Sequence, residues 1–192
     1  MAEHLTDRLA RDLDSGFVEL VRVHGSAIRT YLLRLTGSAV EADDLSQETF
    51  LRALVALKEF SPARRRCLRP RAWLMSIAIN AWRNDVRSKS RRPVSAVRVE
   101  DAGGLWPDER PGPEERAVLT ADRKLLVDAL AELPEHHRVA VVLRHVIGMS
   151  YAEMAEIQGC PVGTVKAHVS RGLAKLRELL EPKALMLKEV MM

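Results

Sequence analysis

A stretch rich in proline and glycine interrupts the helical periodicity of this 192-residue chain and divides it into two blocks. On both sides of the stretch, apolar residues recur at a spacing of about 3.6, which indicates amphipathic helices. No such period survives within residues 89–119, because prolines and glycines punctuate them (Pro93, Gly103, Gly104, Pro107, Pro111, Gly112 and Pro113). The pattern predicts an all-α fold of two small helical domains joined by a flexible linker.

The first domain is expected to span residues 15–90 and to contain three helical stretches. The first stretch ends at Gly37 and fits either one helix or two helices with a break near Gly25. The second stretch runs from Val40 to Phe60, and the third runs over residues 70–88. The third carries an apolar stripe that predicts its buried face (Trp73, Leu74, Ile77, Ala81, Trp82 and Val86).

The second domain is expected over residues 120–182, after an acidic linker at 91–119. Ser150 and Glu153 have the spacing of a capping box, which predicts the start of a short helix. A glycine turn follows, and then a final helix that we expect to end before Pro182, with residues 183–192 as a tail. Five apolar residues are predicted to line the inner face of this final helix (Val165, Val169, Leu173, Leu176 and Leu180).

The charge of the chain is unevenly distributed, although its net value is only +4. Residues 61–93 hold ten basic residues and a single acid, Asp85, whereas residues 100–115 hold six acids and one base. A basic block of this kind indicates a polyanion as partner, and the acidic block indicates a solvated tether.

Several classes of function do not fit the sequence. Two cysteines give neither a metal-binding spacing nor a disulfide framework. The six histidines are scattered, and the pair His136-His137 is expected to cap a surface turn. We therefore expect no enzymatic activity, no metal and no cofactor. The chain start is charged throughout and no apolar run has the length of a membrane span, so we expect a cytoplasmic protein without membrane insertion.

The two helices around Gly159 have the pattern of a helix-turn-helix, whose second helix enters the major groove of DNA. Short polar groups near the start of a helix can approach base edges, and cations further along can meet phosphates. A solvated basic face in a helical bundle is the alternative explanation. The candidate DNA-binding residues on this helix are Thr164, Lys166, His168, Ser170, Arg171 and Lys175.

A second polar face lies on the third helical stretch of the first domain, opposite its apolar stripe. It combines amides and guanidinium groups, which suit bases and phosphates (Asn80, Arg83, Asn84, Arg87 and Arg91). An ordinary amphipathic surface helix is the alternative, but such faces usually mix charges of both signs. Trp73 and Trp82 have the aromatic surface to stack on unpaired bases, although Trp73 shares the apolar stripe and fits the core better.

A third polar stripe lies on the second helical stretch (Asp44, Gln47, Glu48 and Arg52). Its acidic residues do not suit phosphate, so it is either a protein-binding face or a solvated stripe with an internal Glu48–Arg52 pair. The periodicity alone leaves both explanations open.

These motifs resemble the sigma-70 family of RNA polymerase sigma factors. The segment from Asp43 to Ala53 resembles the second-region helix of that family, and the segments 72–74 and 77–80 resemble its promoter-melting helix. The segments 133–134, 150–153, 163–166 and 170–171 resemble its fourth region. Because only these two regions occur, in this order and with a short linker, the chain resembles the extracytoplasmic-function (ECF) subgroup.

The resemblance implies the partners of each face. The stripe with Asp44 would dock on the clamp helices of the largest subunit of core RNA polymerase. The flap of the polymerase would be a further contact of the chain. The face with Asn80 would read the −10 element of promoter DNA, and the Arg-rich segment 61–70 would hold a flipped base or its phosphates. The face with Thr164 would read the −35 element, and an anti-sigma factor is a further implied partner.

The sequence departs from the family at Ala167-His168, where Ser-Arg is common. This difference implies an altered preference at the −35 element. The rival interpretation is a helix-turn-helix regulator that does not act as a polymerase subunit. Such a regulator needs a receiver or ligand-binding domain, and residues 1–90 have neither the strand–helix alternation nor the pocket pattern of one.

Overall fold

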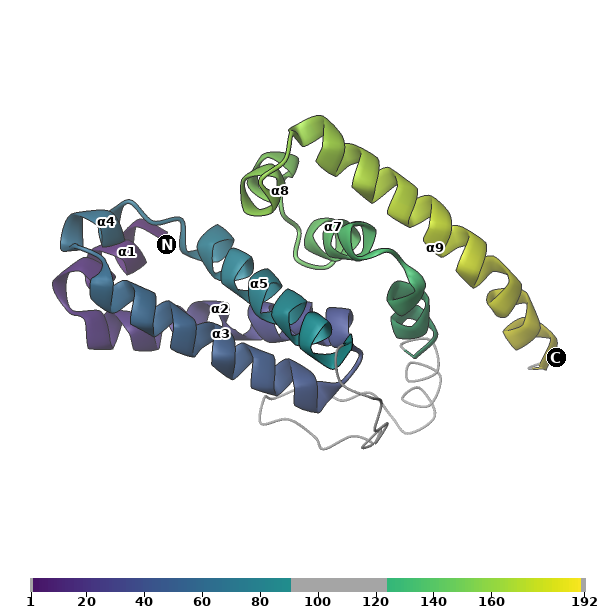
Figure 1. The fold of residues 1–192 in the computed structure, drawn as a ribbon, viewed down its shortest axis with the longest axis horizontal. Helices are drawn as coiled ribbons and strands as arrows, with labels where there is room; N and C mark the ends of the chain where they lie inside the picture. Colours follow the sequence, from purple (N-terminus) through teal and green to yellow (C-terminus); the bar gives the residue numbers. More distant parts are fainter. Residues whose placement is uncertain (1, 91–123, 191–192) are drawn as a thin grey trace.

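The computed structural model describes the backbone of residues 2–90 and 124–190 and the side chains of residues 5–89 and 124–181. All regular elements in these ranges are helices, in agreement with the predicted all-α class (Figure 1). The helices of the first domain are α1 (Ala2–Arg11), α2 (Leu13–Thr36), α3 (Ala39–Glu59), α4 (Pro62–Arg66) and α5 (Pro70–Ser90). A helical segment at 124–132 opens the second domain, followed by α7 (Glu135–His145), α8 (Tyr151–Gln158) and α9 (Val162–Val190). The predicted linker, residues 91–119, lies outside the described residues.

Helices α2 and α3 form a hairpin around a glycine turn. Gly37 adopts a left-handed conformation with φ of 71°, which a glycine accepts without steric cost, and its N–H donates to the carbonyl of Leu33. The side chain of Ser38 then accepts a hydrogen bond from the N–H of Glu41 and caps α3. Gly25 lies within α2, so this stretch is one continuous helix and not two helices with a break at that glycine.

The core of the first domain lies between α2, α3 and α5. Its large members are fully buried and come from all three helices (Leu20, Ile28, Tyr31 and Leu32 from α2, Leu57 from α3, and Leu74, Met75 and Ile79 from α5). The buried face of α5 therefore agrees with the predicted stripe at Leu74, Ala81 and Trp82, while Val86 is 40% exposed. This packing turns the opposite side of α5 outward.

Helix α1 was not predicted from the sequence, and it packs against α2 and α4. Leu5 and Leu9 are buried in the same core as the three longer helices. The crossing of α1 and α2 is close at Gly16, where a Cβ atom would lie 2.6 Å from the Cα of Leu9. The helical unit thus begins well before residue 15, the first residue of the predicted domain.

In the second domain, α8 and the start of α9 form the predicted helix-turn-helix. The Ser150 hydroxyl accepts from the N–H of Glu153, and the Glu153 carboxylate accepts from the N–H of Ser150, which completes the capping box. Gly159 ends α8 in a left-handed conformation with φ of 62°. Val165, Val169 and Leu176 of α9 pack into the domain core with Val139 and Leu143 of α7.

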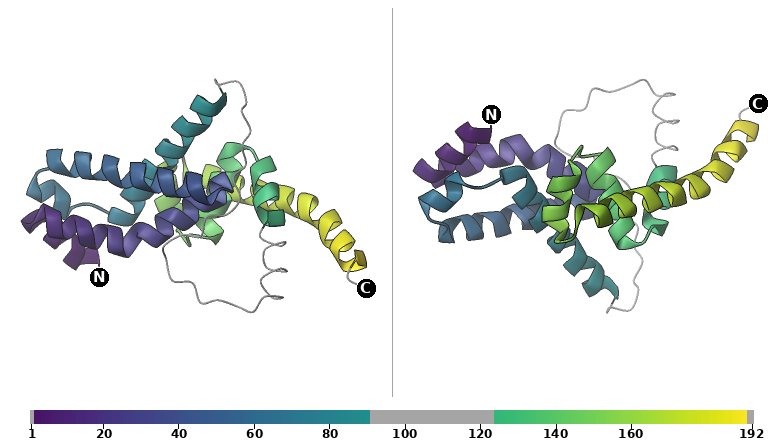
Figure 2. Two further views of the ribbon diagram at one scale, coloured as in Figure 1. Left: turned by 90° about the horizontal axis from the view of Figure 1, so that it is seen from below. Right: turned by 90° about the horizontal axis from the view of Figure 1, so that it is seen from above.

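Two expectations about α9 were wrong. The helix does not end before Pro182 but continues to Val190. A proline inside a helix removes one hydrogen bond and crowds the preceding turn, which can kink a helix without ending it. Figure 2 shows this bend in the last part of α9. Leu173, predicted to be buried, is 36% exposed, and Gly172 takes the inward position beside Val141 instead.

The two domains contact each other mainly through α5 and α8 and through α2 and α7 (Figures 1 and 2). Three ion pairs cross the contact: Arg83 of α5 meets Glu135 of α7 at 2.6 Å, and Arg69 meets two acids of α8, Glu156 at 2.6 Å and Glu153 at 4.0 Å. Two more arginines donate across it to backbone carbonyls, Arg71 to that of Ile147 and Arg138 to that of Leu35. The contact between the domains is therefore largely polar at its edge.

Candidate nucleic-acid interface

The outer face of α9 carries most of the residues predicted to meet DNA. Lys166, Ser170, Arg171 and Lys175 are exposed, and Thr164 is half-buried near the start of the helix. These side chains project outward because their neighbours Val165, Val169 and Leu176 bind α9 to the core. The arrangement places a short hydroxyl near the N-terminus of the helix and cations further along it.

The cations on this face differ in their interaction partners within the protein. The Lys166 ammonium lies 5.6 Å from the centre of the Tyr151 ring, so the first helix of the motif supports it. The Lys175 ammonium pairs with Glu178 at 2.9 Å. Among the described residues Arg171 has no ion-pair partner, which leaves its guanidinium available to an anion.

His168 lies differently from the other members of the set. Its ring is half-buried and points toward α7, with ring centroids 4.7 Å from His136 and 5.7 Å from His137. Burial and the positive charges of His136 and Arg171 lower the pKa of His168. His136 and His137 occupy the first turn of α7, so the expectation that they cap a surface turn was wrong.

The outer face of α5 presents Asn80, Asn84 and Arg87 as exposed side chains. Arg83, on the same face, is half-buried because it pairs with Glu135. Arg91 lies outside the described residues. Trp82 is only 3% exposed, and Trp73 packs against Phe60 with ring centroids 5.9 Å apart. Both tryptophans thus belong to the packing of the first domain, as expected for Trp73.

The Arg-rich segment 61–70 forms the short helix α4, which the sequence did not predict, and its arginines contact groups of the protein. The Arg64 guanidinium lies 3.7 Å from the centre of the Phe60 ring. Arg65 donates to the carbonyl of Leu57 at the end of α3, and Arg66 approaches Asp7 of α1 at 3.5 Å. These contacts join α4 to the helices around it.

A separate polar face lies on α3. Asp44, Gln47, Glu48 and Arg52 are all exposed, and the Arg52 guanidinium donates to Glu48 at 2.7 Å. Two large apolar side chains share this face, Leu51 and Val55, which are 62% and 64% exposed. Apolar side chains this exposed on a charged helix commonly mark a protein-binding surface.

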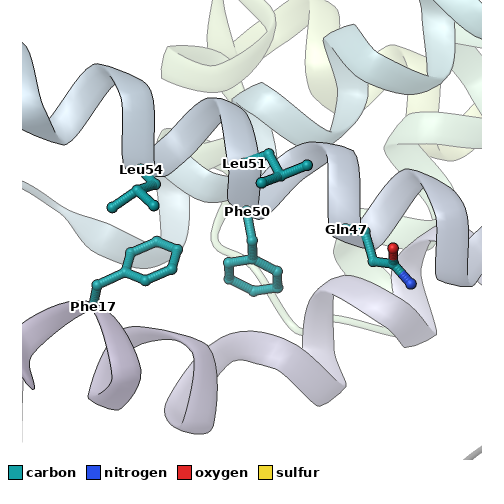
Figure 3. A pocket seen from close by; sticks show the side chains of 5 residues that line it. All are labelled: Phe17, Gln47, Phe50, Leu51 and Leu54. Carbon is teal, nitrogen blue, oxygen red and sulfur yellow. The ribbon is translucent and has the colours of Figure 1, made fainter. Parts of the chain in front are cut away.

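The same face opens into a shallow apolar groove between α2 and α3, with a volume of about 250 Å³. In Figure 3 the rings of Phe17 and Phe50 lie side by side at its floor, 6.4 Å apart, and Leu51, Leu54 and Gln47 line its edge. Sequence periodicity missed this feature, because it did not separate the buried apolar residues of α3 from the exposed ones.

The described part of the chain has neither a metal-binding cluster nor a membrane-spanning helix. None of its histidine, cysteine and acidic residues gather in a group of three that would hold a metal ion. No helix among the described residues is long and apolar enough to span a membrane. Cys67 and Cys160 are free thiols.

Comparison with known families finds a match for each of the two domains. The family described as Sigma-70 region 2 matches residues 20–92, and the family described as Sigma-70, region 4, matches residues 123–176. The first match contains α5 and the face on α3, and the second contains the helix-turn-helix.

Curated relatives extend the similarity over most of the chain. The chain is 37% identical to the ECF RNA polymerase sigma factor EcfG of Rhodopseudomonas palustris, over 80% of this chain and 79% of the relative. It is 34% identical to the RNA polymerase sigma-H factor of Pseudomonas aeruginosa, over 94% of both chains.

Two solved structures have a similar fold. CnrH, determined in complex with the cytosolic domain of CnrY, matches with a TM-score of 0.70 and 26% identity over 95% of this chain and 99% of CnrH. The sigma factor RpoE of Bartonella quintana, determined in complex with the anti-sigma factor NepR, matches with a TM-score of 0.64 and 26% identity over 86% of this chain and 96% of RpoE.

Proposed function

Because this chain belongs to the ECF subgroup of sigma-70 RNA polymerase sigma factors, we propose that its three exposed faces divide the work of promoter recognition. As a sigma factor it binds core RNA polymerase and directs initiation at promoters, and the family does not carry out catalysis itself. One observation supports the proposal above all: each family region contains an exposed helix face rich in cations or amides. These faces lie on α5 in region 2 and on α9 in region 4.

The face of α9 is proposed to read the −35 element. Thr164 stands in the first turn, where a short hydroxyl can reach base edges, and each good base contact contributes about 1–3 kcal/mol to discrimination. Lys166, Ser170, Arg171 and Lys175 are exposed on the following turns and suit backbone phosphates. His168 is proposed to contact the −35 element from the edge of this face, since its ring also lies against His136 of α7.

The face of α5 is proposed to contact the −10 element and the opened strand. Asn80, Asn84 and Arg87 are exposed there, and Arg83 joins them once its pair with Glu135 separates. Arg91, which lies outside the described residues, is assigned to this face from its helical spacing. Extruding a base from the duplex costs about a few kcal/mol, which contacts to the unpaired strand offset. No group on this face performs bond chemistry in the proposal, because the polymerase supplies the chemical step.

The face of α3 is proposed to dock on the clamp helices of the largest polymerase subunit. It combines the charged residues Asp44, Glu48 and Arg52 with exposed Leu51 and Val55, and thus has the apolar centre and polar rim of a protein interface. The second domain is proposed to contact the polymerase flap. Since polymerase and promoter are cytoplasmic, we place the chain in the cytoplasm as well.

Run-off transcription tests the proposal directly. Core polymerase alone and core polymerase with this chain are compared on a genomic promoter library, and the 5′ ends of the transcripts are sequenced. We expect new start sites that share two upstream elements and depend on this chain. A regulator that is not a polymerase subunit would instead bind DNA without core polymerase and would need another sigma factor, so start sites that appear only with a second sigma factor contradict the proposal.

Replacing Arg171 with alanine is expected to weaken binding to −35 DNA almost uniformly across sequences. The guanidinium lies two turns into α9 without an ion-pair partner among the described residues, where it suits a phosphate. Loss of one phosphate contact reduces the slope of log affinity against log salt by about one unit. Arg177→Ala is the matched control, since Arg177 is exposed on another side of the same helix. A changed base preference with an unchanged slope would contradict the phosphate role.

A regulatory protein partner is the last part of the proposal. Two similar proteins of known structure were determined as complexes, CnrH with the cytosolic domain of CnrY and the sigma factor RpoE with the anti-sigma factor NepR. We propose that an anti-sigma factor also controls this chain, because its polymerase-binding face on α3 is exposed in the free protein. Affinity capture from native cells tests this, and recovery of polymerase without any regulatory chain would count against it.

A further inference from the structure

Three imidazole rings meet where the first turn of α7 crosses α9, and we call them the histidine cluster: His136, His137 and His168. Their ring centroids lie 4.3, 4.7 and 5.7 Å apart. The crossing is tight, because a Cβ on Gly172 of α9 would lie 3.3 Å from both the Cβ and the carbonyl oxygen of His137. The backbones of α7 and α9 therefore lie close together at the histidine cluster.

The surroundings of His137 and His168 disfavour their protonation. Burial lowers the pKa of His137, and the charges of His136, His168 and Arg171 lower it further. Burial also lowers the pKa of His168, together with the charges of His136 and Arg171. The N-terminal end of α7 adds a positive helix dipole. Nδ1 of His168 is buried and has no hydrogen-bond partner among the described residues, so a proton there would lack an acceptor.

The acids near the cluster are engaged elsewhere. On α7, Glu135 pairs with Arg83 of α5, and Arg138 donates to the carbonyls of Leu35, Ala131 and Leu133. On α8, Glu153 accepts from Ser150, and Glu156 pairs with Arg69. On α9, the charged group that acts on the cluster is the cation Arg171. Within the described residues, no carboxylate is among the groups that shift the pKa of His137 or His168.

We propose that the histidine cluster makes the packing of α7 against the DNA-reading helix α9 sensitive to mild acid. At neutral pH the lowered pKa values keep His137 and His168 uncharged, and the three rings pack together. Protonation of more than one ring places like charges within 6 Å of each other beside Arg171, which drives α7 and α9 apart. The consequence for −35 binding rests on the proposed function of α9, whereas the acid sensitivity itself does not.

The direction of the effect follows from linkage. A histidine has an unperturbed pKa of about 6.5 in an unfolded chain. Because the pKa values of His137 and His168 are lower in the folded protein, the unfolded chain binds more protons below pH ~6.5. The stability that the neutral rings provide is therefore complete above about pH 6.5 and is lost as the pH falls through the lowered values.

Nuclear magnetic resonance of the full chain tests the proposal through the imidazole Cε1–H signals. We expect His137 and His168 to titrate below pH ~6.5, and His168→Gln to move the pKa of His137 back toward that value. His136→Gln, at an exposed position, is expected to shift both remaining rings in the same direction. His145→Gln is the matched control, because His145 is exposed at the other end of α7 and outside the cluster.

Thermal unfolding of the same variants gives an independent measure. Between pH 7.5 and 5.5 the wild type is expected to lose several °C more in Tm than His168→Gln, in proportion to the stability lost. His24, a half-buried histidine of the first domain with a lowered pKa, contributes equally to both proteins and cancels in the comparison. Equal losses in wild type and His168→Gln, or three rings that titrate independently near 6.5, would overturn the proposal.

Discussion

Replacing Asp44 and Glu48 together with arginine is expected to abolish binding to core RNA polymerase while both domains stay folded. Both side chains are exposed on α3, so the substitutions leave the core untouched. Reversing two charges at an interface places like charges opposite each other and costs several kcal/mol. We expect at least about a hundredfold loss of affinity, since each 1.4 kcal/mol is a factor of ten. Gel filtration with core polymerase, or fluorescence anisotropy of labelled chain, measures it.

Two variants make this result specific. Asp44→Asn with Glu48→Gln removes the charges without reversing them, and we expect a smaller loss because Leu51 and Val55 still offer their apolar surface. Glu178→Arg, an exposed reversal on α9, is expected to leave core binding unchanged. Co-purification of the double arginine variant with core polymerase at normal yield would place the docking surface elsewhere.

Deleting ten residues from the linker is expected to collapse promoter activity while each domain still folds. Residues 93–118 reach at most about 86 Å when fully extended, and a chain shortened by ten residues reaches about 53 Å. Promoter elements about 20 base pairs apart lie roughly 68 Å apart along the duplex. The shortened chain cannot bind both elements at once. These residues lie outside the described structure, and their reach follows from their number alone.

Initiation from a promoter library measures this prediction, with the far-ultraviolet circular dichroism of the variant as the control for folding. Replacing the same ten residues with a Gly/Ser segment of equal length separates length from composition. If length alone matters, the replacement restores activity. Normal initiation by the shortened chain on an unaltered promoter would show that the two domains bind closer together than the duplex spacing requires.

Sequence patterns predicted the elements of this fold well where one local interaction sets an end. Gly37, Gly159 and the capping box at Ser150 each act within a few residues, and the structure has the expected turn or cap at all three. Pro182 was misleading because a proline costs one hydrogen bond inside a helix, and the surrounding helix tolerates that cost. Helix α1 escaped prediction because its buried residues, Leu5 and Leu9, are few among charged neighbours.

The candidate faces were predictable as stripes but not in their tertiary surroundings. Helical spacing put Arg83 with Asn80 and Asn84, yet it carried no information that Glu135, 52 residues later, would pair with it. It also placed His168 on the outer face of α9, whereas His136 and His137 from another helix lie beside its ring. The exposure of Leu51 and Val55 depends on which side of α3 meets α2 and α5, and periodicity does not reveal that choice when apolar residues occur on two sides.

The ion pairs between the domains affect how the chain responds to salt. Arg83–Glu135 and Arg69–Glu156 are partly exposed, so added salt weakens them and favours separation of α5 from α7 and α8. Salt also weakens the contacts between cations and phosphates that the separated faces make. The two effects oppose each other, and the free chain should therefore show a shallower salt dependence of DNA binding than its phosphate contacts alone require. Once polymerase holds the domains apart, the full dependence should appear.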